Sequence, residues 1–180
     1  AAWLATLLFI AAETMLFSGL ITAYMVFRWG APAWPPASQP RLPIGLTGIS
    51  TTLLIMSLVP LAAAGRAAVS GERARTAAGL SRAAFVGAMF LAIQGFEWSR
   101  LIAFGLTAQS GVYGGTFYAI VGAHAIHLAG GLAWLGAVFA RVRAGTGVRW
   151  EAPAQLGAAM LYWKFVVLLW PVLYVIVYLA

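Results

Sequence analysis

Long, uninterrupted runs of apolar residues constrain the fold of this chain more than any other feature. A helix needs roughly 20 apolar residues to cross the hydrocarbon core of a bilayer, and five runs of about that length or longer follow one another. Only 8% of the 180 residues are charged, against about a quarter in a soluble domain. The sequence therefore predicts one all-α membrane domain, a bundle of five transmembrane helices at residues 3–27, 46–64, 80–106, 116–140 and 153–179.

The segments between the runs are typical of loops. Gly30 to Pro43 holds four prolines before its last residue, and proline at that density cannot continue a helix. Pro60 lies inside the second run and predicts a kink, which neighbouring helices in a bundle can tolerate. Polar connectors are expected from Arg66 to Thr76, at the QSGVYGG segment and at RVRAGTGVRWE.

The formal net charge of +7 comes from arginines in the gaps between the apolar runs. A basic balance can indicate nucleic-acid binding, but this placement is better explained by the positive-inside rule. Such loops can also attract anionic lipid headgroups. The arginines on one side predict a cytoplasmic N-terminus and a periplasmic C-terminus in a bacterial inner membrane; they are Arg66, Arg73, Arg75, Arg82, Arg141, Arg143 and Arg149.

The few metal-ligating residue types limit the redox chemistry of this chain. There is no cysteine, which excludes disulfides, thiolate-bridged copper, iron–sulfur ligation and covalent c-type haem attachment. The two histidines, His124 and His127, are three residues apart on one predicted helix, so they cannot approach a haem from opposite faces. We expect them to form hydrogen bonds between helices. A metal site built with Glu13 or Glu97 is the alternative.

Glu13 lies near the middle of the first apolar run. Removal from water disfavours the charged form of a carboxyl group at that depth. It can serve as a proton-exchanging group or as a lid on a water pocket. It can equally be a protonated acid that is hydrogen-bonded to a neighbouring helix, and the sequence does not separate these readings.

Three other polar residues share one face of the third run. Gln94, Glu97 and Arg100 are spaced three apart, which predicts a polar seam with an internal ion pair, or else a site for a lipid headgroup or an ion. In the fifth run, the Lys164 amine can snorkel towards the cytoplasm or pair with an acid on another helix. The eight tryptophans mostly lie near run ends, as in interfacial belts.

Five segments in order resemble subunit III of the haem–copper terminal oxidases. FIAAETMLFSGLITAY resembles the helix that carries the family's intramembrane carboxylate, at Glu13. SGVYGGTFYAIVGAHAIH resembles the family's glycine-rich helix with its two histidines. The other three are LPIGLTGISTTLLIMS, FLAIQGFEW and YWKFVVLLWPVLYVIVY. Lys164 stands where the family usually has His, and Val166 where it usually has Asp, which suggests a divergent branch.

This resemblance implies an accessory subunit that packs on the catalytic subunit I, and on subunit II, of a proton-pumping oxidase. Haem and copper would lie in the partner, with none in this chain. Bound phospholipid would be expected, Glu13 would take the proton-related role, and Gln94, Glu97, Arg100, His124 and His127 would form an internal polar network. Alternatives are an accessory protein of a nitric oxide reductase, a small transporter or channel, and a purely structural assembly factor.

Overall fold

The computed structural model describes residues 2–37, 39–145 and 152–179, and these residues form helices and loops without strands. Five helical segments are long and apolar enough to cross a membrane, which confirms the predicted helical membrane bundle. The second segment is formed by two consecutive helices. The elements are α1 (Ala2–Gly30), α2 (Ile44–Met56), α3 (Leu58–Val69), α4 (Arg73–Ala103), α5 (Val112–Ala144), α6 (Ala152–Tyr174) and the π-helical turn η2 (Val175–Leu179).

Several helices extend beyond the apolar runs. The predicted polar connector between the second and third spans is mostly helical, because α3 continues to Val69 and α4 already begins at Arg73. The third span ends earlier than predicted, at Ala103. There Gly105 adopts a φ of +90°, and the N–H groups of Gly105 and Leu106 bond to the carbonyls of Ile102 and Leu101. This is the glycine-closed helix end known as a Schellman motif.

The second span is interrupted where the sequence predicts a kink. α2 ends at Met56, Ser57 separates the two helices, and α3 begins at Leu58. A proline lacks an N–H group, and its ring collides with the carbonyl four residues earlier. For Pro60 that carbonyl belongs to Met56, so the break falls where the proline requires it.

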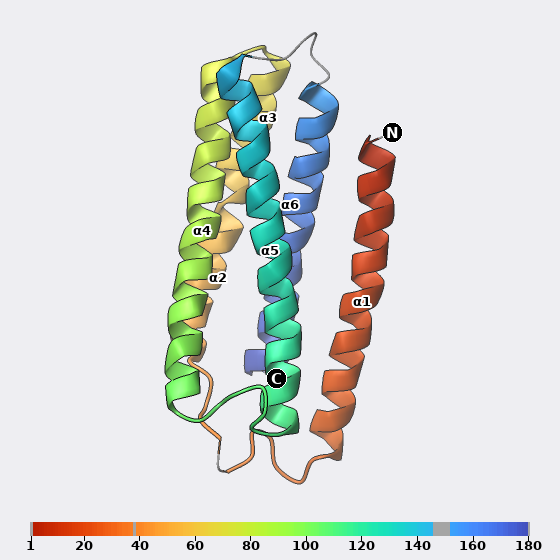
Figure 1. Cartoon of the computed structure of the whole chain (residues 1–180), viewed down its shortest axis with the longest axis vertical. Helices are drawn as coiled ribbons and strands as arrows, with labels where there is room; N and C mark the ends of the chain where they lie inside the picture. The colour runs from red at the N-terminus through yellow and green to blue at the C-terminus, as the bar shows by residue number, and fades with distance from the viewer. Residues whose placement is uncertain (1, 38, 146–151, 180) are drawn as a thin grey trace.

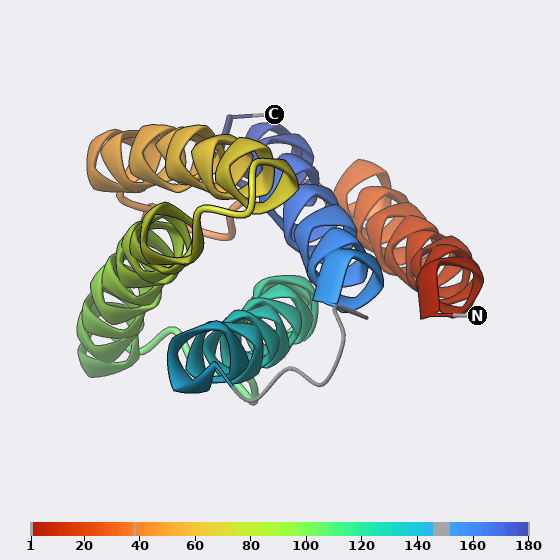
Figure 2. The same cartoon turned by 90° about the horizontal axis from the view of Figure 1, so that it is seen from above.

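The five spans form one bundle in which α6 has a central place (Figures 1 and 2). α6 contacts α1, α2, α3 and α5, whereas α1 stands at the edge and packs on α5 and α6. The N- and C-termini lie at opposite ends of the bundle, and the turn between α3 and α4 lies at the end that holds the N-terminus (Figure 1). Arg149, one of the arginines of the predicted cytoplasmic side, lies outside the described residues.

The centre of the bundle contains two of the tryptophans. Trp163 and Trp170 on α6 are fully buried, and their indole N–H groups donate to Ser57 Oγ at 3.0 Å and to Thr51 Oγ1 at 2.8 Å. Gly87 on α4 leaves room for the Trp163 ring, because a Cβ atom at that position would lie 2.7 Å from Trp163 Cζ2. These two residues depart from the expectation of an interfacial belt and join α6 to α2 and α4.

Candidate functional site: a carboxyl–imidazole pair between helices

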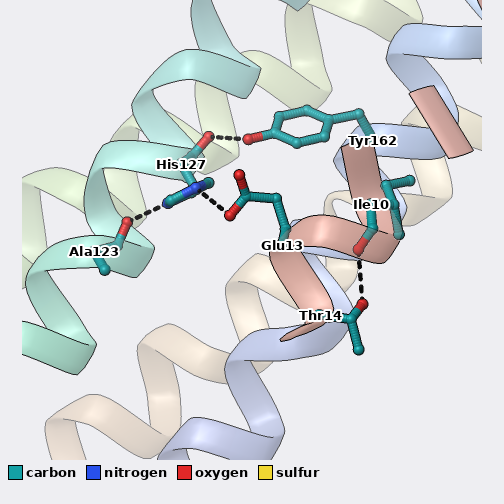
Figure 3. Close-up of polar contacts among 6 residues, drawn as sticks. All are labelled: Ile10, Glu13, Thr14, Ala123, His127 and Tyr162. Carbon is teal, nitrogen blue, oxygen red and sulfur yellow. Dashed lines mark hydrogen bonds and ion pairs between the residues drawn. The ribbon is translucent and has the colours of Figure 1, made fainter. Parts of the chain in front are cut away.

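Among the described residues, one ion-pair contact joins titratable side chains of different helices, Glu13 on α1 and His127 on α5. Glu13 Oε2 lies 2.7 Å from His127 Nε2 (Figure 3), and the two side chains are 12% and 17% exposed. Phe17, one turn after Glu13, packs edge-on against the His127 ring at 5.3 Å between centroids. Residues four apart share a face of a helix, so α1 presents an acid and an aromatic ring together to α5.

The other nitrogen of His127 determines how the pair shares a proton. Nδ1 lies 2.6 Å from the carbonyl oxygen of Ala123, which can only accept a hydrogen bond, so Nδ1 carries a proton. In a neutral imidazole, Nε2 then has no proton and can accept a hydrogen bond from a protonated Glu13. In a charged imidazole, Nε2 donates to a Glu13 carboxylate. In both arrangements a single proton would lie between Nε2 and Oε2.

Tyr162 on α6 lies beside this pair (Figure 3). The Tyr162 hydroxyl on α6 donates to the backbone carbonyl of His127 at 3.2 Å (Figure 3). The Tyr162 ring lies 5.7 Å from both the Phe9 ring and the Trp134 ring. α6 therefore fixes the backbone that positions the imidazole, while α1 supplies the acid.

His124, one turn before His127, has a different environment. It is fully buried, and its ring stacks on Trp170 at 4.8 Å with Phe17 and Phe90 around it. Neither ring nitrogen has a hydrogen-bond partner among the described residues. The part of the chain that the structure describes also contains no group of three or more His, Cys, Asp or Glu side chains able to hold a metal ion.

A second polar cluster lies between α2 and α4. Glu97 is 2% exposed, and its carboxyl oxygens lie 3.0 and 3.1 Å from Thr47 Oγ1. Gln94 Nε2 donates to Glu97 Oε2 at 2.7 Å. A buried carboxyl group needs such hydrogen bonds to offset the loss of water, so this cluster joins α2 to α4.

The structure thus divides the polar residues singled out in the sequence. Gln94 and Glu97 lie together with Thr47, and Glu13 lies with His127. Arg100 is exposed, with its guanidinium 5.9 Å from the Phe96 ring centroid, and no ion pair joins it to Glu97 among the described residues.

Sequence reasoning missed Thr47 and Tyr162 as members of these clusters. The hydroxyl residues of the second run carried a usable signal. Thr47, Ser50, Thr51 and Ser57 are all buried. The last three follow Thr47 by three, four and ten residues, which places all four near one face of a helix. Tyr162 offered no comparable pattern, because its partner is a backbone carbonyl.

The fold and the site define a multi-pass membrane protein with a carboxyl–imidazole pair held between its helices. A family model described as cytochrome c oxidase subunit III matches residues 3–180, and the chain belongs to that family. It is an accessory subunit of a haem–copper oxidase and associates with other oxidase subunits.

Relatives in bacteria cover almost the whole chain. It is 34% identical over 172 residues to cytochrome c oxidase subunit 3 of Synechocystis sp., a match that covers 96% of this chain and 72% of the relative. It is 34% identical over 181 residues to a probable cytochrome c oxidase subunit 3 of Nocardia farcinica, covering 96% and 85%. Identity to the cytochrome bo(3) ubiquinol oxidase subunit 3 of Pseudomonas putida is 26% over 172 residues, covering 96% and 82%.

Proposed function

We propose that this chain docks on the catalytic subunit I of its oxidase, next to subunit II, and supports proton uptake there through the Glu13–His127 pair. The haem and copper of the complex belong to the partner subunits. The complex lies in a bacterial inner membrane with the arginine-rich end of the bundle in the cytoplasm. The observation that carries the proton role is the 2.7 Å contact between Glu13 Oε2 and His127 Nε2.

This contact is suited to storing and exchanging one proton. The imidazole and the carboxyl group can each hold the shared proton, so its transfer between them requires no rearrangement of the backbone. Both side chains remain partly exposed, which leaves a route for exchange with water or with a neighbouring subunit. A titratable group within a transmembrane helix that faces a partner is a common feature of proton pathways.

Glu13→Gln tests the proton role in the intact oxidase. The amide matches the size of the carboxyl group and can donate a hydrogen bond to His127 Nε2, but it cannot exchange a proton. We expect normal assembly and haem content, a several-fold fall in proton uptake during turnover, and a shorter operating lifetime. These are measured with the purified complex reconstituted in vesicles.

Thr14→Val is the matched control, because Thr14 is the exposed neighbour of Glu13 and its hydroxyl donates to Ile10 O on the same helix. It should leave proton uptake and lifetime at the level of the unaltered complex. If Glu13→Gln also leaves turnover, pumping and lifetime unchanged, the pair has a structural role only.

Phospholipid binding is the second part of the proposal, and a basic cavity between α3 and α4 supports it. The cavity has a volume of about 490 Å³ and is lined by small apolar residues and by the polar side chains of Arg66, Ser70, Glu72, Arg75 and Arg82. Glu72 forms a 2.7 Å ion pair with Arg75. Arg66 and Arg82 form no ion pair among the described residues. Guanidinium groups at the cytoplasmic edge of a membrane suit a lipid phosphate.

The double variant Arg66→Gln/Arg82→Gln should lose about one anionic phospholipid per chain, as measured by mass spectrometry of lipids that co-purify with the complex. The control is Arg141→Gln/Arg143→Gln, which removes the same charge from exposed positions near the end of α5 and outside the cavity. Equal lipid losses in the two double variants would indicate general attraction to charge and would contradict a specific site.

A further inference from the structure

Lys164 lies deep in a membrane-spanning helix and points out of the bundle. The span covers Gln155–Leu179, so Lys164 is about 14 Å along the helix from Gln155 at a rise of 1.5 Å per residue. Its neighbour Tyr162 touches His127, which sets Lys164 near the depth of the Glu13–His127 pair. The side chain is nevertheless exposed on the surface of the chain.

No acidic side chain among the described residues forms an ion pair with this amine. The two salt bridges among the described residues involve Glu72 and Glu13, and no hydrogen bond from Lys164 occurs there. A lysine stem spans little more than one helical turn, about 5.4 Å. It cannot carry the amine from this depth to the headgroups at the end of the span. An amine facing hydrocarbon is unfavourable, so such residues normally face a partner or a water-filled cavity.

The side of α6 that carries Lys164 is free of the other helices. Tyr162 faces α1 and α5, and Lys164 is two residues further on, about 200° around the helix at 100° per residue. Leu168 and Val172 follow at intervals of four residues and are 56% and 49% exposed. α6 packs on four helices with its other faces (Figure 2). Lys164, Leu168 and Val172 therefore form one open stripe, the Lys164 stripe.

We propose that the Lys164 stripe is an interface with another subunit of the oxidase, whose transmembrane helix presents an aspartate or glutamate carboxylate to the Lys164 amine. Charge complementarity selects this occupant, because a purely apolar helix or lipid tails would leave the amine without a counter-charge. Leu168 and Val172 supply the apolar contact beside the ion pair. The inference rests on the association of this chain with other oxidase subunits and is independent of the proton role of Glu13.

A zero-length cross-linking experiment on the intact, detergent-purified oxidase tests the interface. A carbodiimide activates a carboxyl group, and a touching amine then displaces the activating group to form an amide; the carbodiimide leaves as a urea and takes up the elements of water. Lys164 is the only lysine in the sequence, so side-chain amine cross-links from this chain must come from Lys164. We expect mass spectrometry to find it joined to an acidic residue of another polypeptide.

Two variants of Lys164 complete the test. Lys164→Arg keeps the charge but removes the reactive amine, so the cross-link should disappear while the partner stays bound. Lys164→Met removes the charge at an exposed position, where it does not disturb the core. It should lower retention of the partner several-fold in a detergent wash.

An intact complex without the cross-linked peptide would overturn the proposal, as would a cross-link within one chain or between two copies of it. Equal retention of the partner by the Met and Arg variants would also overturn it. In each case, haem that co-purifies with the chain would show that membership of the oxidase still holds.

Discussion

Trp163→Ala is expected to lower the thermal unfolding midpoint of the chain by about 6–20 °C. Trp163 is fully buried against Gly87 on α4, and its indole N–H donates to Ser57 Oγ between α2 and α3. Removing a buried tryptophan side chain costs about 3–5 kcal/mol because it leaves a cavity. Each kcal/mol lowers the midpoint by about 2–4 °C in a chain of this size. Stepwise heating of the detergent-purified oxidase, followed by quantification of this chain in the soluble fraction, measures the shift.

Trp29→Ala is the control for this prediction, because Trp29 near the end of α1 is 76% exposed. Its loss should change the midpoint little, since few contacts within the chain are removed. Similar shifts in the two variants would contradict the central packing role of Trp163.

Gly79→Val is expected to prevent α3 and α4 from packing closely and to reduce strongly the amount of folded protein in the membrane. A Cβ atom at Gly79 would lie 2.7 Å from the backbone oxygen of Pro60 and 3.0 Å from the Cα of Ala64. Backbone atoms of a helix cannot turn aside as a flexible side chain can, so the two helices must separate. Overpacking a tight contact typically costs about 1–3 kcal/mol, and more where the backbone has to move.

Gly95→Val makes the same substitution on the same helix at a position with no atom within 4 Å of the added Cβ. Quantitative immunoblots of the membrane fraction should show near-normal levels of this variant and little of Gly79→Val. Comparable levels of the two would show that the contact between α3 and α4 is more adaptable than the geometry indicates.

The number of spans could be predicted from the sequence because lipid imposes a length and a composition on each of them. The helix ends were less predictable. Arg73, Arg75 and Thr76 are polar, yet they belong to α4. A helix can continue into the membrane–water interface when its backbone hydrogen bonds remain satisfied. The early end at Ala103 depends on the left-handed conformation of Gly105, which hydropathy does not report.

The candidate site was predictable in part. A carboxyl group at bilayer depth identified Glu13, and the spacing of Gln94 and Glu97 placed both on one face. The pairing of Glu13 with His127, and the separate aromatic environment of His124, depend on how α1 and α5 are rotated against each other. Periodicity within one helix does not fix that rotation. The burial of Trp163 was likewise hidden, because a tryptophan in an apolar run also fits an interfacial belt.

The most direct test of the account is mild detergent purification through a tag on this chain, followed by an optical spectrum and identification of the subunits. We expect haem absorption in the purified complex, with the haem held by a different polypeptide that co-purifies in a fixed ratio. Recovery of the chain as a stable particle on its own, or of a haem ligated by its own side chains, would contradict the account.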